Sequence, residues 1–390
     1  MRNRLVVVLL AWMLPAAAQN TLFVPGVEVA PGATATAEVL FTARGPSVSG
    51  IQFDLEFPAN VLSVTGAAGS AATDAGKSAS SAQVAEGRVR FLVAGLNRNA
   101  FGSGPIVTLQ WTAAAGAPAG SYTIQLTGAA STDPDGVIVP IEVAASSVGI
   151  GRSPAPVVFP GGVVNAASFL TGAVPGSVIS LFGERLAVTA EGAAGVPLPT
   201  RLGEARATLN GVLMPLFYAA PGAAGNPGQI NAQVPWEIPA GGSAQLIVSV
   251  GGSESPSLAV PVVAVAPGLI QYGANRVVAV NPSGAVNGPG SPARPGDTVV
   301  IYLTGGGALE AGTTLVTGAP APGELRRVAG NFTCTMGGVP ARVDYLGLTP
   351  GAIGLYQLNA VVPALAPGDH AVVLTIEGTA SNAPLLAVGN

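Results

Sequence analysis

This sequence has very few of the side chains that carry chemistry. Its 390 residues include one cysteine (Cys334), one histidine (His370) and one lysine (Lys77). A lone cysteine excludes an intrachain disulfide, and so few histidines and cysteines exclude most metal sites and most nucleophilic catalysis. Only 9% of the residues are charged and the net charge is −4, so no basic surface for nucleic acid is expected. The sequence therefore predicts a protein that is not an enzyme, has no cofactor and binds no nucleic acid.

Long helical segments are also missing. The chain contains 54 glycines and 34 prolines, which interrupt nearly every stretch that could form a helix. Short β-branched or alternating runs separated by turn residues take their place, and residues 51–57 (Ile-Gln-Phe-Asp-Leu-Glu-Phe) alternate strictly between apolar and polar. This pattern predicts an all-β protein built of sandwiches. The expected strands are 36–42, 51–57, 88–94, 106–111, 122–126, 178–182, 246–250, 299–303 and 371–376.

The first residues have the pattern of a secretory signal peptide. Arg2 and Arg4 precede an apolar run, and small residues at Ala16 and Ala18 fit the site that signal peptidase cleaves. The run is shorter than the roughly 20 residues that a membrane-spanning helix needs. We expect residues 1–18 to be removed and the mature protein to be secreted; an uncleaved N-terminal anchor is the alternative.

The rest of the chain divides into a first domain, a linker and a repeated pair. Residues 148–162 read as a linker between a first domain at 20–147 and two repeats at 163–265 and 266–390. The repeats share a Pro-Gly strand start at 175–183 and 295–305, and a Gln-x-Asn motif at 229–231 and 357–359. Each repeat has the length of one sandwich domain.

One segment offers carboxylates at the spacing of a calcium loop. Asp133, Asp135 and Glu142 stand at positions 3, 5 and 12 of a loop that would begin at Ser131. Against calcium, Asp135-Gly136 is a common hairpin turn, and the residues before Glu142 read as a strand that would carry it away from Asp135. The turn is the favoured interpretation, and calcium at these three residues is the alternative.

Three other polar features are interpreted as structural. Residues 71–78 resemble a phosphate-binding loop, but their Ala-, Gly- and Ser-rich surroundings predict a flexible loop over 66–81. Asp54 and Glu56 share one side of their strand, and we expect both on the solvent face. The glutamines and asparagines of the repeated motif are expected to bind loop backbone through their amides.

Two family resemblances follow from longer motifs. Residues 22–145 resemble a cohesin domain through the segments 31–37, 48–62, 87–91, 106–111 and 119–123. This resemblance implies a jelly-roll sandwich that binds a dockerin module or, in related forms, carbohydrate. Residues 157–388 resemble the C-terminal module of secreted Solibacter-type bacterial proteins, through 227–236, 281–284 and 288–290. That resemblance implies two immunoglobulin-like, IPT/TIG-like repeats and no known activity.

Together these features predict an exported, non-catalytic binding or adhesion protein. Its cohesin-like domain would contact a polysaccharide or a partner protein at the cell surface or in the secretome. A structural spacer or envelope component without a specific ligand is the alternative. An accessory part of polysaccharide degradation is a more distant one.

Overall fold

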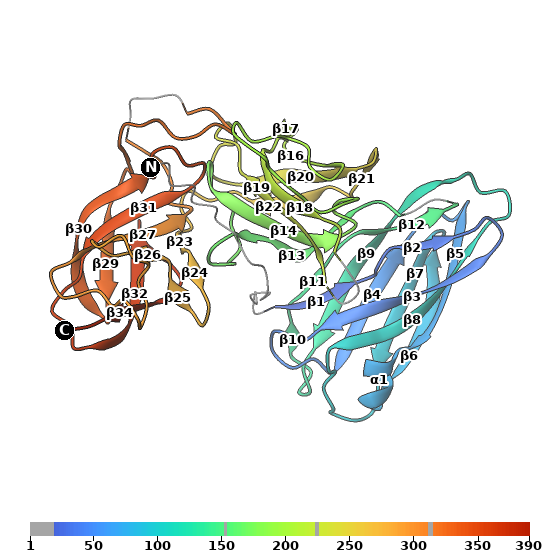
Figure 1. Ribbon diagram of the computed structural model, residues 1–390. Helices are drawn as coiled ribbons and strands as arrows, with labels where there is room; N and C mark the ends of the chain where they lie inside the picture. The colour runs from blue at the N-terminus through green and yellow to red at the C-terminus, as the bar shows by residue number, and fades with distance from the viewer. Residues whose placement is uncertain (1–18, 152–153, 223–225, 311–314) are drawn as a thin grey trace.

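The predicted all-β architecture is confirmed. The computed structural model describes residues 19–151, 154–222, 226–310 and 315–390, and in these ranges the strands group around three large hydrophobic cores (Figure 1). The expected signal peptide, residues 1–18, lies outside the described residues. In the ranges described, no helix is long and apolar enough to cross a membrane. We call the units around the three cores the first, second and third modules.

The first module is a sandwich of two sheets. One sheet contains, in order, β11 (Ile141–Val143), β1 (Asn20–Phe23), β3 (Thr34–Thr42), β8 (Gly104–Ala113) and β5 (Leu62–Ala68). The other contains β2 (Val27–Val29), β12 (Ser146–Ile150), β9 (Gly120–Thr132), β4 (Gly50–Glu56), β7 (Arg88–Ala94) and β6 (Ser78–Ala85), with β10 (Ile138–Val139) paired to β9.

Alternating residues build the core of this module. Ile51, Phe53 and Leu55 point inward from β4 and are almost fully buried. The Phe53 ring stacks on Phe91 of β7 with centroids 5.3 Å apart, and Trp111 of β8 is fully buried. Because the period of two puts every second side chain on the other side of the sheet, the residues between them face outward.

The prediction of a flexible loop over residues 66–81 is wrong. Those residues contain the end of β5, a short helix α1 (Ser70–Asp74) and the start of β6. Ala71 and Ala72 are buried where α1 contacts β8, because small side chains let a helix approach a sheet closely. Lys77 is 5% exposed, and its ammonium group donates to the carbonyl of Asn97 at 2.7 Å. Burial lowers the pKa of this lysine.

The second module contains two sheets and the third a continuous one. The second has β13 (Val157–Asn165), β14 (Val178–Glu184), β19 (Gly228–Gln233), β18 (Leu216–Ala220) and β15 (Glu191–Gly192) in one sheet. Its other sheet has β17 (Val212–Leu213), β16 (Ala205–Leu209), β20 (Ser243–Val250) and β21 (Ser253–Glu254), with β22 (Leu258–Pro261) paired to β20.

The strands of the third module form one continuous sheet. Its order is β23 (Gly268–Leu269), β27 (Thr298–Thr304), β31 (Tyr356–Val361), β30 (Val339–Leu348), β29 (Phe332–Met336), β32 (Gly368–Ile376), β34 (Leu385–Val388), β25 (Arg276–Val277) and β24 (Gln271–Tyr272). β26 (Ala279–Val280), β28 (Arg326–Arg327) and β33 (Thr379–Ala380) pair beside this path.

The repeated motifs occupy equivalent places in the two modules. β14 pairs with β19 and β19 with β18, just as β27 pairs with β31 and β31 with β30. β30 runs through both layers of the third module, since its first residues pair with β29 and its later ones with β31. The single strand β30 thus makes both pairings that two separate strands, β17 and β18, make in the second module.

The prediction that the amides of the repeated Gln-x-Asn motif bind loop backbone is wrong. The Gln229 amide donates to the side-chain oxygen of Asn231 at 2.8 Å, and Gln357 donates to Asn359 at 3.1 Å. These residues lie two apart on β19 and β31, so their side chains are on one side of the strand and reach each other rather than loop backbone. Cys334 lies in β29 and is buried, with 2% of its surface exposed. Its burial raises the pKa of the thiol to about 12.

Side chains connect each module to the next. Strands β12 and β13 occupy both ends of the expected linker 148–162. Beside them, the Phe23 ring packs edge-on against Phe159 with centroids 4.9 Å apart. Between the second and third modules, the Asn165 amide donates to the carbonyl of Ala266 at 2.9 Å. The Val178 amide also donates to the Thr304 hydroxyl at 2.9 Å.

Candidate functional site

The outward face of β9, β4, β7 and β6 is the candidate site, and we call it the β4–β7 face. Cross-strand register aligns its side chains in rows. Gln52 of β4 lies beside Leu92 of β7, Asp54 beside Arg90, and Glu56 beside Arg88. Strand β6 continues these rows with small residues, since it pairs with β7 along its length. The face therefore carries charged residues on β4 and β7 and small residues beside them on β6.

Asp54 is not the solvent-exposed residue that the sequence predicts. Its side chain has no solvent exposure and forms ion pairs with Arg88 and Arg90. Arg90 donates from Nε to Oδ1 at 2.6 Å and from Nη2 to Oδ2 at 2.9 Å, and Arg88 donates from Nε to Oδ2 at 2.7 Å. Two guanidinium groups on one carboxylate form a charge-assisted cluster that fixes all three side chains.

This cluster sets the ionisation of Asp54. The hydrogen bonds from Arg90, supported by those from Arg88, hold the pKa of this carboxyl below its usual value, although burial opposes the shift. The arginine side chains themselves remain 39% and 44% exposed. Asp54 is thus covered by polar groups at the surface and stays charged at neutral pH.

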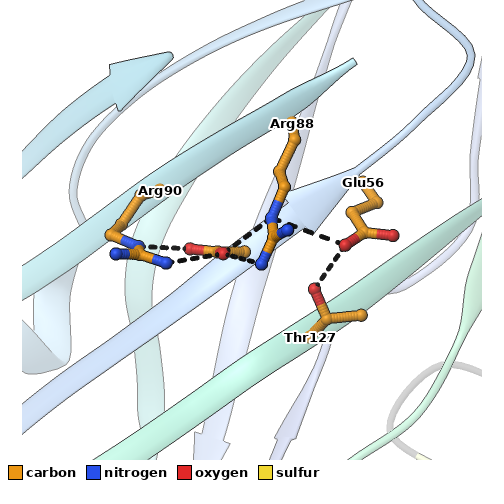
Figure 2. A network of polar contacts seen from close by, with 5 residues as sticks. Glu56, Arg88, Arg90 and Thr127 are labelled. Carbon is orange, nitrogen blue, oxygen red and sulfur yellow. Dashed lines mark hydrogen bonds and ion pairs between the residues drawn. The ribbon is translucent and has the colours of Figure 1, made fainter. Parts of the chain in front are cut away.

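Glu56 is half-buried and is held by its neighbours. Its Oε1 accepts the hydroxyl of Thr127 from β9 at 2.8 Å and lies 3.5 Å from Nε of Arg88 (Figure 2). Both outward acids of β4 are therefore occupied by protein partners. Two free carboxylates facing each other across a cleft, as glycoside hydrolysis needs, are not formed by this pair.

The large exposed apolar side chains of the first module belong to one of its two sheets and to the loops that adjoin it. Among its described residues, the large exposed apolar side chains are Val84, Leu92, Leu96, Val137 and Ile138. All belong to the sheet of the β4–β7 face or to loops that adjoin it, and Leu92 is 46% exposed. The outward positions of the opposite sheet include polar residues such as Thr36 and Gln110. Exposed apolar groups beside charged ones are typical of protein-binding surfaces.

The candidate calcium residues lie in a hairpin that is closed by its own hydrogen bonds. Asp133 Oδ1 accepts the backbone amides of Asp135 at 2.8 Å and Val137 at 2.9 Å. Asp135 forms an ion pair with Arg98, and Glu142 lies in the separate strand β11. Over the part of the chain that is described, no three His, Cys, Asp or Glu side chains come together as metal ligands.

Sequence reasoning missed Arg88 and Arg90 as site residues. The available signal was their alternation in the strand predicted at 88–94, which matches the alternation of Asp54 and Glu56 in 51–57. Opposite charges at equal spacing on two strands can pair across a sheet. Which strands are neighbours depends on the topology, however, and a single sequence does not give it.

Comparisons with known proteins give one family match, and it covers the first module. The family model for the cohesin domain matches residues 21–150. Among solved structures, a non-cellulosomal cohesin from Archaeoglobus fulgidus is 22% identical, with a TM-score of 0.29 over 34% of this chain and 91% of that chain. The sixth cohesin of scaffoldin B from Acetivibrio cellulolyticus, in complex with a Cel5 dockerin, is 19% identical, with a TM-score of 0.31 over 34% and 99%. A search of curated proteins gives no match.

Proposed function

From the cohesin domain at residues 21–150, we propose that this chain is an exported, non-catalytic binding protein whose first module docks a partner protein on the β4–β7 face. The observation that carries the proposal is the composition of this face. It combines exposed apolar residues with a charge cluster whose members are fixed before any partner arrives. Preorganised side chains cost little entropy on binding.

The near-neutral charge of the face favours a partner protein whose own binding surface carries little net charge. Asp54 and Glu56 balance Arg88 and Arg90, so the centre of the face is close to neutral. A partner with an apolar patch rimmed by polar groups would match Leu92 and its surroundings. Solved cohesin structures are in complex with dockerins, which makes a dockerin-like protein the first candidate.

Export is the second part of the proposal and rests on the sequence of residues 1–18. The charged, apolar and small-residue regions follow in the order that signal peptidase requires. N-terminal sequencing of the protein from the culture medium should give Gln19 as the first residue. Retention of Met1 on the exported protein would contradict cleavage.

A capture experiment with the full mature chain distinguishes the proposed function from its alternatives. We would immobilise the chain and present purified dockerins, the native secretome, and insoluble polysaccharides in parallel. The proposal predicts saturable binding of a protein that competes with a purified dockerin or occupies the same face. Binding of polysaccharide alone through the first module would replace the protein partner with a glycan. Absence of any saturable binding would favour the structural spacer.

A further inference from the structure

A cleft of about 400 Å³ opens where the second and third modules meet. Trp236, which follows the strand β19, forms part of its wall. Most of the remaining wall is made of small alanine, glycine and proline residues from both modules, such as Ala308. Clefts of this size between domains are frequent positions for small-molecule sites.

The Trp236 ring is held in a fixed position. It packs so closely on Gly176 that a Cβ atom there would collide with the ring. Its backbone amide donates to the Thr317 hydroxyl at 3.0 Å. The ring also lines a smaller hollow of about 170 Å³, so it separates two open spaces. The Trp236 side chain is therefore part of the wall that a ligand in the larger cleft would meet.

The charged residues on the same wall do not have all of their hydrogen bonds formed within the protein. Arg326 lines the cleft, and its Nη2 donates to Glu324 at 2.6 Å. Its Nε is buried and has no hydrogen-bond partner among the described residues. Buried donors without a partner are rare in folded proteins, and the Arg326 side chain as a whole is 19% exposed, so part of it faces solvent. Glu310, an exposed residue of the wall, adds an acceptor.

These groups select the chemistry of the ligand. On the wall itself Glu310 balances Arg326, so a strongly charged ligand gains no net electrostatic attraction there. A neutral sugar ring instead offers C–H groups to the Trp236 ring and hydroxyl groups that both accept from Arg326 and donate to Glu310. We propose that the cleft at Trp236 binds a neutral saccharide, independently of the partner that docks on the first module.

The cleft is preformed by contacts between its two modules. The Leu198 amide donates to the carbonyl of Gly318 at 2.8 Å, and the Gly318 amide donates to the side-chain oxygen of Gln233 at 2.7 Å. These bonds join a loop of the third module to the second, close to Trp236. Binding a saccharide therefore needs little reorganisation of the protein.

Tryptophan fluorescence of the mature chain tests this proposal directly. Outside residues 1–18 the tryptophans are Trp111, which is fully buried, and Trp236. Titration with xylotetraose, mannotetraose and cellotetraose should give a saturable signal with at least one of them, and Trp236→Phe should abolish that signal. Ala308→Leu, which fills the cleft, should weaken binding by about tenfold or more, the loss expected for one blocked contact region. Arg326→Gln should also weaken it.

The matched control is Ala380→Leu, the same change at an exposed residue of β33 that does not line the cleft. It should bind as the unchanged protein does. The proposal is overturned if none of the three probes gives a saturable signal. It is equally overturned if Ala308→Leu binds with unchanged affinity, or if galacturonate binds more tightly than galactose.

Discussion

At the scale of single residues, the position of Asp54 is the feature that the sequence alone describes least well. The alternation of residues 51–57 places Asp54 on the outward side of its strand, and the structure agrees. The complete burial of its side chain comes from Arg88 and Arg90 on a neighbouring strand. Local periodicity identifies the side of a sheet, whereas cover by long side chains depends on tertiary register.

Replacing Asp54 tests how strongly the cluster fixes this face. Asp54→Asn removes the charge that two guanidinium groups share, and we expect a loss of about 1–2 kcal/mol in the free energy of unfolding at pH 7, because both arginines remain partly exposed. Urea unfolding followed by Trp111 fluorescence in a Trp236→Phe background measures the first module. Glu56→Gln, at a half-exposed acid, is the control with a smaller loss.

The same variant has a defined pH dependence. The pKa of Asp54 is lowered in the folded protein, so its stabilisation is present above the unfolded value of about 3.9 and disappears as the pH falls through the lower folded value. The stability difference between the unchanged protein and Asp54→Asn should therefore shrink in strongly acidic solution. A difference that is absent at pH 7, or that grows on acidification, would contradict this account of the cluster.

At the scale of elements, strands with clear alternation are predicted well and small-residue segments are not. Strand β7 has the limits 88–94 that the sequence predicts. Helix α1 was missed because Ser, Ala, Thr and Asp carry little periodic signal, and its burial depends on contact with β8. The repeated amides were recognised as a pair of motifs, yet their mutual hydrogen bonds depend on strand geometry that the motif does not state.

The hairpin at residues 131–139 carries a prediction about calcium. Because Asp133 already accepts two backbone amides and Asp135 pairs with Arg98, we expect calcium to leave the melting temperature unchanged. Asp133→Ala should lower the free energy of unfolding by about 1 kcal/mol, the usual contribution of such hydrogen bonds. Asp135→Ala is the control, and it should cost less because its ion pair is exposed. A calcium-dependent rise in melting temperature that Asp135→Ala removes would instead establish a metal site with Asp133 and Glu142.

At the scale of the whole molecule, the modules differ in how they are joined. A small cluster around Phe23 and Phe159 and a hydrogen bond from the Gly26 amide to the Glu184 carboxylate at 3.3 Å connect the first module to the second. The second and third modules share several hydrogen bonds and the contacts around Trp236. Composition predicted three units, because turn-rich segments and the repeat are visible in the sequence. The contacts that join them involve residues far apart in the chain and are visible only in the fold.

Limited proteolysis should separate the modules in a fixed order. We expect proteinase K to cut first between residues 148 and 162 and later near residue 266, since cleavage concentrates where few contacts cross a junction. Mass spectrometry of the early products should find a stable fragment that ends in the first of these regions. Phe159→Ala should accelerate that cut and leave the later one unchanged. A first cut near residue 266 would contradict the assignment of the weaker junction.

The most direct test of the proposed function compares two substitutions on opposite sheets of the first module. Leu92→Arg places a charge among the exposed apolar residues of the β4–β7 face, and Thr36→Arg places the same charge on the opposite sheet. Affinity for the captured partner protein would be measured with the full mature chain by biolayer interferometry. We predict that Leu92→Arg weakens binding by about tenfold or more, as expected for disruption near an interface centre, and that Thr36→Arg leaves it unchanged. Unchanged binding of Leu92→Arg, or loss of binding in Thr36→Arg, would contradict docking on the β4–β7 face.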